Sequence, residues 1–288
     1  MKGWLVTNGF LRSDKFSEIY AFLAKSASEE GMELTLKTSS ALSCTLDEEI
    51  FTDGKPDFVI FWDKDYHLAS RLQGAGVRLF NNADGIRYCD DKALTALLVH
   101  GKLPMPKTVI APKTFDGVGY SDRDFLCRAS QTLGYPMIVK ESFGSFGQQV
   151  YLAQDGAELN KIVDNLKAKP FIMQEFIESS KGRDVRVNVV GGRVFCAILR
   201  ENKNDFRSNI SGGGTATEYV PTPAQAELAI RACKLLGLDF GGVDVLFGEN
   251  EEPLLCEVNS NPQFKSTYDC TGKDMSVAIM RHIKECLL

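Results

Sequence analysis

Two short apolar runs near the C-terminal end of the chain constrain the fold most strongly. They span residues 242–247 and 253–259, and turn-forming residues 248–250 separate them, so the sequence predicts a β-hairpin. We expect Phe247 to lie opposite Leu254, a register that places Asp244 opposite Glu257. The apolar face of the hairpin then carries Val243, Val245, Phe247, Leu254, Cys256 and Val258, and the polar face carries Asp244, Glu257 and Asn259.

The polar face of this hairpin predicts a metal site. Two carboxylates directly across a strand pair repel each other, and a cation between them removes that repulsion. Mg²⁺ commonly binds one or two protein carboxylates together with the phosphates of a substrate. We therefore expect Asp244, Glu257 and Asn259 to hold Mg²⁺ beside a phosphate ligand. The alternative is that these residues form the solvent-exposed face of a surface hairpin.

Composition limits the range of partners. The chain has 288 residues with 33 basic and 38 acidic side chains, and its net charge of −5 gives no general attraction to nucleic acid. No apolar run approaches the roughly 18 residues of a membrane span, and the N-terminal residues lack a signal-peptide pattern. None of the eight cysteines stands in a Cys-x-x-Cys pair, which favours reduced thiols. We expect a cytoplasmic protein without nucleic-acid or membrane partners, and a homo-oligomer stays open.

Residues 1–89 have the pattern of a small α/β domain. Short apolar runs alternate with helical segments, and this alternation is typical of a parallel sheet. We expect strands at residues 4–6, 34–36, 57–62 and 76–80, and helices at residues 16–27 and 68–72.

The pattern changes after residue 89, and we expect two further units, at residues 90–170 and 171–288. A helix should begin at Thr222, because residues 222–225 combine a capping box with a proline in the first helical position, and it should end at Gly237. Residues 202–218 contain a glycine run and predict a mobile loop. The other expected elements are helices at 91–98, 124–133, 159–166 and 274–286, strands at 137–140, 149–152 and 171–175, and a hairpin at 185–199.

A phosphate ligand needs a binding loop, and two familiar ones are missing. The sequence has neither a Gly-x-x-x-x-Gly-Lys-Ser/Thr loop nor a Gly-x-Gly-x-x-Gly loop after a strand. Lys140 instead ends a strand just before the glycine-bearing turn 143–147, where a lysine and bare backbone N–H groups can bind phosphates. A protein kinase is excluded, because its glycine loop precedes the lysine and its His-Arg-Asp motif is absent here. For Lys140 alone, a solvated strand end is the alternative.

The succession of motifs resembles the ATP-grasp superfamily, and within it the RimK-like carboxylate–amine ligases. That family includes enzymes that add glutamate to a ribosomal protein or to a deazaflavin coenzyme. The resemblance covers about residues 75–288, and the α/β start suits the pre-ATP-grasp domain of the family, so the expected fold class is α/β and α+β. The matching motifs are Asp91-Lys92, Lys140 with its glycine turn, Gln174-Glu175-Phe176-Ile177, residues 181–186, Arg200, residues 205–209, Asp244, and Glu257-Val258-Asn259.

The resemblance implies a role for each matching residue. ATP would be bound by Lys92, Lys140, Ser145, Gln174, Glu175, Phe176, Ile177, Asp184, Arg207, Ser208 and Asn209. Within this set the two lysines would contact phosphates, residues 174–177 would form the adenine hinge, and Asp184 would lie near the ribose. Asp244, Glu257 and Asn259 match the magnesium ligands, with two Mg²⁺ ions expected and Mn²⁺ possible as a substitute. Alternatively, Glu175 is a surface acid, and Asp184 pairs with Arg183 or Arg186.

The implied chemistry is formation of an amide through an acyl phosphate. A substrate carboxylate would attack the γ-phosphate of ATP, and an amine would then displace phosphate. Arg200 and Arg207 would act as catalytic residues by stabilising charge on the acyl phosphate, since a guanidinium holds two oxygens at once. The loop 202–218 would close over this intermediate and keep water away.

The identity of the substrates does not follow from the sequence. Residues 261–265, Asn-Pro-Gln-Phe-Lys, replace the more common ending after the metal asparagine and should border the acceptor pocket. The acid and the amine are expected to be small molecules or peptides. Two other classes stay open: a phosphotransferase acting on a hydroxyl group, and a nucleotide-binding regulator without turnover.

Overall fold

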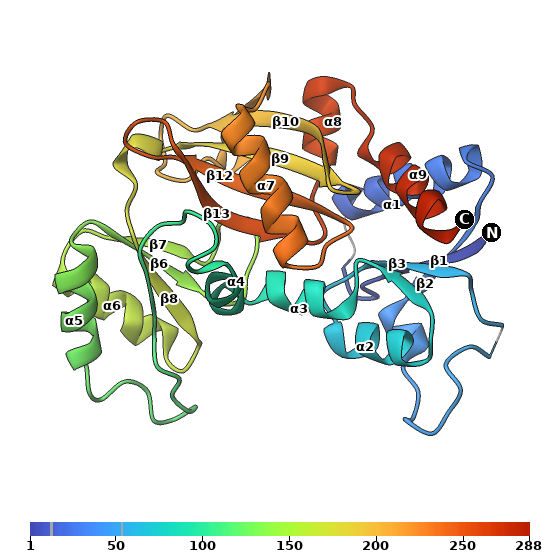
Figure 1. The fold of residues 1–288 in the computed structure, drawn as a ribbon. Helices are drawn as coiled ribbons and strands as arrows, with labels where there is room; N and C mark the ends of the chain where they lie inside the picture. Colours follow the sequence, from blue (N-terminus) through green and yellow to red (C-terminus); the bar gives the residue numbers. More distant parts are fainter. Residues whose placement is uncertain (12–13, 53) are drawn as a thin grey trace.

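The computed structural model describes residues 1–11, 14–52 and 54–288, without the side chains of residues 14 and 15. Three sheets organise this part of the chain (Figure 1). None of its helices is both long enough and apolar enough to cross a membrane.

The first sheet is parallel, as the alternating sequence pattern predicted. Its strand order is β2-β1-β3-β4, and every neighbouring pair runs in the same direction. Apolar side chains on both faces are buried, which is typical of a parallel sheet covered by helices. The elements are β1 (Lys2–Thr7), α1 (Asp14–Glu29), β2 (Glu33–Thr38), the 3₁₀ turn Ser39–Leu42, β3 (Phe58–Trp62), α2 (Tyr66–Gly74) and β4 (Arg78–Phe80).

The second sheet is antiparallel, with strand order β5-β8-β6-β7. Helices α3 and α4 connect it to the first sheet (Figure 1). Because β8 belongs to this sheet, a division of the chain between residues 170 and 171 would cut it, and we propose a division after Glu175 instead. The elements are α3 (Ala83–Asp90), α4 (Lys92–Val99), β5 (Thr108–Ile110), α5 (Asp124–Leu133), β6 (Met137–Glu141), β7 (Val150–Ala153), α6 (Gly156–Leu166) and β8 (Phe171–Glu175).

The third sheet has the order β11-β10-β9-β12-β13, with antiparallel neighbours throughout. Its elements are the 3₁₀ turn Glu178–Ser180, β9 (Arg183–Val190), β10 (Arg193–Glu201), the 3₁₀ turn Ile210–Gly212, β11 (Thr215–Tyr219), α7 (Pro223–Leu235), β12 (Phe240–Phe247), β13 (Pro253–Asn259), α8 (Lys265–Thr271) and α9 (Met275–Leu287).

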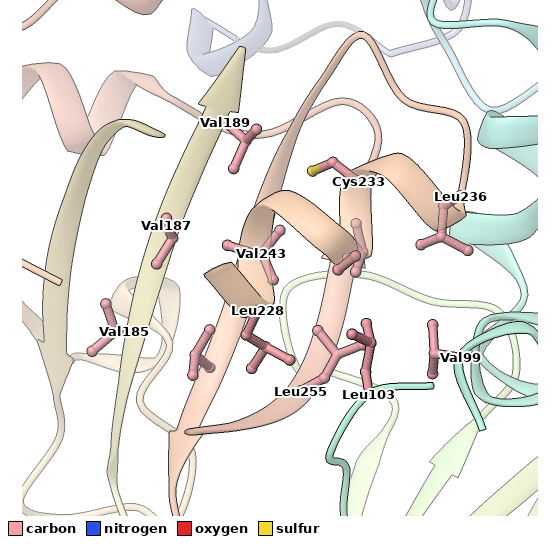
Figure 2. Packing of buried hydrophobic residues seen from close by; sticks show 14 of the residues in the cluster. Val99, Leu103, Val185, Val187, Val189, Leu228, Cys233, Leu236, Val243 and Leu255 are labelled. Atoms are coloured by element: carbon pink, nitrogen blue, oxygen red, sulfur yellow. The ribbon is translucent and has the colours of Figure 1, made fainter. Parts of the chain in front are cut away.

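Helix α7 covers one face of the third sheet. Figure 2 shows Val185, Val187 and Val243 facing Leu228 of this helix, and all four side chains are buried. The predicted start of α7 is confirmed, since Thr222 and Gln225 form a reciprocal capping box ahead of Pro223. Because side chains alternate along a strand, burying the valines of β9 on this face turns Asp184 and Arg186 to the opposite face.

The loop predicted at residues 202–218 is wrong at its C-terminal end. Residues 215–219 form the edge strand β11, which pairs with β10 over the register Ala197–Tyr219 to Glu201–Thr215. The alternating Thr-Ala-Thr-Glu-Tyr sequence suits such a half-exposed strand, and the glycine run before it obscured this signal. The segment between the strands therefore spans residues 202–214.

Candidate active site

A cavity of about 770 Å³ opens where the three sheets meet, on the face of the third sheet opposite α7. It brings together all but one of the residues predicted to bind ATP or metal or to act in catalysis. These are Lys140, Ser145, Gln174, Glu175, Phe176, Ile177, Asp184, Arg200, Arg207, Ser208, Asn209, Asp244, Glu257 and Asn259. The remaining residue, Lys92, lies next to them, with its Nζ 3.8 Å from Glu257 Oε1.

The acidic pair lies across β12 and β13 as predicted, with Asp244 opposite Glu257, but the register near the turn differs. Phe247 faces Pro253 rather than Leu254, and a β-bulge between Asp244 and Val245 restores the expected pairing. As a result, Leu255 packs in the core, where Leu254 and Cys256 were expected, and Cys256 lines the cavity. The predicted register was wrong near the turn, because the alternation of apolar residues does not reveal an extra residue on one strand.

Buried ion pairs cross the floor of the cavity. Arg186 makes a two-pronged ion pair with Asp244, and its second contact joins the NH2 nitrogen (Nη2) to Oδ2 at 2.9 Å. Arg200 donates from Nε to Asp184 Oδ1 at 2.7 Å, and its Nη2 lies 3.0 Å from Asp244 Oδ1. Asp184 therefore pairs with Arg200, and neither Arg183 nor Arg186 is its partner.

The ion pairs shift the pKa values of Asp244 and Arg200. Burial raises the pKa of Asp244, but the charges of Arg186 and Arg200 outweigh this effect and lower the pKa to about 2. Burial alone would lower the pKa of Arg200, and the carboxylates of Asp184 and Asp244 raise it well above its ordinary value. Asp244 and Arg200 are thus both charged at neutral pH.

The side chain of Lys140 is a buried cation. It lies at the end of β6 and is 8% exposed. Its ammonium contacts the Cys256 thiol at 3.6 Å, and among the residues that the structure describes no carboxylate forms an ion pair with it. Burying an unpaired charge is costly, so this position favours binding of an anion.

The glycine turn and the segment 202–214 both line the cavity and contact each other. Arg207 donates from its NH1 nitrogen (Nη1) to the carbonyl of Gly147 at 2.9 Å, and it also pairs with Asp205 at 2.8 Å. Gly147 has a φ of +72°, and a Cβ there would lie 2.5 Å from Asn209 Oδ1. Glycine is therefore required at this position for both its backbone conformation and the close approach.

The turn is also held from the first sheet and from within. Lys64 donates to Ser145 Oγ at 3.0 Å, while the backbone N–H of Ser145 donates to Gln149 Oε1 at 3.1 Å. Gln149, two residues after the turn, thus helps to fix the turn conformation.

An apolar region with a polar edge forms the other end of the cavity. Ile138, Val150 and Leu246 line it, together with the segment that follows β8. Gln174 is buried and donates to Thr108 Oγ1 at 2.9 Å, and Glu175 accepts from the Lys107 backbone N–H at 2.7 Å. The side chain and the backbone N–H of Glu175 are therefore engaged locally, and the remaining backbone groups of residues 175–177 form the polar edge.

Asp63, which follows β3, and the segment after β13 also contribute buried polar atoms to the cavity. Asp63 Oδ2, Asn261 Oδ1 and both amide atoms of Gln263 are buried and have no hydrogen-bond partner among the described residues. All three residues belong to the cavity lining. Ordered water or a bound molecule usually satisfies such atoms. The sequence pointed to residues 261–265 as the border of an acceptor pocket, and Asn261 and Gln263 do line the cavity. It gave no sign of Asp63, because the position of this residue depends on the packing of two domains.

The donor set at the acidic pair fits Mg²⁺. Asp244, Glu257 and Asn259 supply oxygen donors from adjacent strands, which is the chemistry that this ion prefers. The Asn259 amide nitrogen donates to the Gly242 carbonyl at 3.4 Å, which identifies Oδ1 as the oxygen available for a ligand. The Glu257 side chain keeps 30% of its surface exposed. Asp244 is the constrained member, since two arginines already hold it.

Solved structures share the fold of this chain. A RimK domain protein from Sphaerobacter thermophilus superposes with a TM-score of 0.74 at 20% identity, covering 96% of this chain and 98% of that chain. D-alanine–D-alanine ligase from Bacillus anthracis, solved with ATP, gives a TM-score of 0.73 at 17% identity, covering 100% and 97%. At these identities the likeness shows the fold, which is that of the ATP-grasp ligases.

Sequence relatives define the family. An uncharacterised protein of Mycoplasma genitalium is 31% identical over 274 residues, which cover 91% of this chain and 92% of that protein. N-acetylaspartylglutamate synthase A of Homo sapiens is 34% identical over 206 residues, covering 70% of this chain and 51% of the human protein. A probable alpha-L-glutamate ligase of Parasynechococcus marenigrum is 34% identical over 224 residues, covering 76% and 46%.

The family model of the RimK-like ATP-grasp domain matches residues 89–283. The chain therefore belongs to the RimK-like ATP-grasp family. Its reaction class is ATP-dependent ligation of a carboxylate to an amine, as the sequence predicted.

Proposed function

We propose that this protein is an ADP-forming acid–amino-acid ligase, in which the cavity binds ATP and Mg²⁺ together with a carboxylate and the amine of an amino acid. The observation that carries the proposal is the buried ammonium of Lys140, which forms no ion pair with any described residue and lines the same cavity as the Asp244–Glu257 pair. An anion beside Lys140 and cations beside the acids would complement both groups, and a magnesium–triphosphate supplies both charges.

The cavity has an apolar end and a charged end, and this difference supports one orientation of the nucleotide. The adenine would lie between Ile138, Val150 and Leu246, and residues 175–177 would offer backbone groups to its edge. The glycine turn would face the phosphates, together with Lys92, Lys140 and Ser145. Asp184 would lie near the ribose, and its ion pair with Arg200 would hold it there. Asp244, Glu257 and Asn259 would hold two Mg²⁺ ions, or Mn²⁺ in their place, which neutralise charge as two anions approach.

The reaction divides into two transfers. A carboxylate oxygen of the acid attacks the γ-phosphorus, the bond to the β-phosphate oxygen breaks, and ADP leaves with that electron pair. The free amine then attacks the acyl carbon, phosphate departs, and the amine loses a proton as the amide forms. Arg207 is placed to stabilise the acyl phosphate because it joins segment 202–214 to the glycine turn. Arg200 acts from the floor, where its pair with Asp184 fixes its orientation.

A polar amino-acid substrate is supported by the buried atoms of Asp63, Asn261 and Gln263. Three of the four unpartnered atoms are acceptors and one is a donor. The group therefore suits a molecule that carries an ammonium and a carboxylate. The two relatives named above as a synthase and a glutamate ligase agree with a product that contains an amino acid. The free thiols of all eight cysteines support a reducing compartment such as the cytoplasm.

Hydroxylamine trapping tests the proposal. The protein is incubated with Mg-ATP, hydroxylamine and a panel of small dicarboxylic and N-acylated acids, with ADP and hydroxamate measured in parallel. The proposal expects stoichiometric hydroxamate and ADP with at least one acid, and an amide when an amino acid replaces hydroxylamine. A stable phosphorylated alcohol without hydroxamate would instead establish a phosphotransferase, and absence of ADP formation with every acid would contradict the ligase assignment.

A further inference from the structure

A second cluster of metal-binding side chains lies outside the cavity. Asp239, just before β12, meets His282 and Cys286 of α9, and their ligand atoms all lie within 4.8 Å of one another. His282 and Cys286 are four residues apart, so both occupy the same face of the helix. None of the three residues lines the cavity described above.

The separations between these atoms match one tetrahedral site. His282 Nε2 lies 3.2 Å from Asp239 Oδ1 and 3.6 Å from Cys286 Sγ. Zinc bond lengths of about 2.1 Å to nitrogen or oxygen and about 2.3 Å to sulfur, at a tetrahedral angle, give separations of about 3.4 Å and about 3.6 Å. The three donors could therefore surround a single ion with small changes in side-chain position. Cys286 is exposed, which leaves the fourth position open to water.

The carboxylate of Asp239 has capacity for a further partner. Its Oδ1 accepts from Arg78 at 2.7 Å, whereas its Oδ2 is buried and has no hydrogen-bond partner among the described residues. A carboxylate ligand of a metal ion commonly keeps such a hydrogen bond from a neighbouring residue, which orients it. The Arg78 contact is therefore compatible with ligation by Asp239. Without an ion, the same contacts would form a simple ion-pair cluster.

We propose that Asp239, His282 and Cys286 form a binding site for a zinc-class divalent transition metal ion. The mixed donor set of thiolate, imidazole and carboxylate favours such an ion over Mg²⁺, which prefers oxygen donors. The bound ion would fix the C-terminal helix to the loop ahead of β12, the strand that also carries Asp244. This site is independent of the proposed ligase activity, and its effect would be on the stability of the fold.

Cobalt(II) is the probe, because a cobalt–thiolate bond gives an intense near-ultraviolet absorption band that oxygen and nitrogen ligands do not give. The full-length protein is titrated with Co²⁺ in excess Mg²⁺, and Zn²⁺ is then added as a competitor. The proposal expects one equivalent of Co²⁺ with the thiolate band, displacement by Zn²⁺, and a higher unfolding temperature with Zn²⁺.

Two variants and a matched control identify the ligands. Cys286→Ser should abolish the thiolate band, and His282→Gln should weaken Co²⁺ binding at least tenfold. Cys127→Ser, at another exposed cysteine, should leave both unchanged. The proposal is overturned if the wild-type protein shows no thiolate band, because the cluster is then held by ion pairs alone. It is also overturned if the band survives in Cys286→Ser, because another cysteine then binds the metal.

Discussion

Arg186 and Asp244 lie opposite each other on β9 and β12 and form a two-pronged ion pair at the floor of the cavity. The same carboxylate is a proposed magnesium ligand. Arg186 and Arg200 thus already neutralise part of the negative charge of the carboxylate that a metal ion would bind. This arrangement keeps the buried carboxylate ionised, and it links the ion pair to both stability and ligand binding.

The first prediction concerns stability at low pH in the presence of a metal chelator. The folded state lowers the pKa of Asp244 to about 2 from 3.8, so its ionised form stabilises the protein above about pH 4. This contribution is lost as the pH falls toward 2. The difference in free energy of unfolding between the wild type and Asp244→Asn should therefore shrink by about 2 kcal/mol over this range. Urea titrations at several pH values measure it, and a constant difference would contradict the ion-pair account.

Glu257 should matter for nucleotide binding only when a metal is present. Glu257→Gln keeps the shape of the side chain but removes one negative donor, so nucleotide affinity should fall about tenfold or more in Mg²⁺. In chelator the affinity should match that of the wild type. Calorimetry with a non-hydrolysable ATP analogue gives both values, and Glu249→Gln in the exposed β12–β13 turn is the control. Equal losses with and without Mg²⁺ would show that Glu257 does not hold the metal.

Gly147 and Gly192 form a matched pair for testing closure of the glycine turn. Both have positive φ, at +72° and +71°, but only at Gly147 would the Cβ of an alanine have a neighbouring atom within 4 Å. Both alanine variants should lose about 1 kcal/mol from backbone strain. Gly147→Ala alone should also lower turnover, because the added methyl group displaces Asn209. Thermal unfolding and ADP formation separate the two effects, and equal turnover in both variants would argue against closure.

Arg207 should act on turnover rather than on nucleotide affinity. Arg207→Ala is expected to retain binding of ATP while acid-dependent ADP formation falls about 100-fold or more, because charge on the transferred group loses a donor. The exposed Arg193→Ala serves as control. Undiminished ADP formation in Arg207→Ala would remove the assigned role.

Local patterns predicted most elements of the fold. The apolar alternation around Asp244 and Glu257 and the capping box at Thr222 depend on near neighbours in sequence, so they could be inferred directly. The β-bulge, in which Cys256 is the extra residue on β13, could not be inferred from sequence, and neither could the edge strand β11. Both depend on how the strands pair.

The candidate site, too, was only partly predictable from the sequence. Residues on the ATP-grasp strands were found from the order of motifs, whereas Asp63 and Lys64 reach the cavity only through the packing of the first sheet. The ion-pair partner of Asp184 could not be predicted either. Arg200 lies on the neighbouring strand, whereas Arg183 and Arg186 are closer in sequence.

Lys140→Met offers the most direct test of the central claim that a buried lysine binds the phosphates of Mg-ATP. Calorimetric titration of a non-hydrolysable Mg-ATP analogue should show affinity about 10–100-fold lower than in the wild type, since a charge-assisted contact is lost. Without ligand, the variant should unfold at an equal or higher urea concentration, because an unpaired buried charge has been removed. The exposed Lys161→Met should change neither. Unaltered analogue affinity in Lys140→Met would contradict the account.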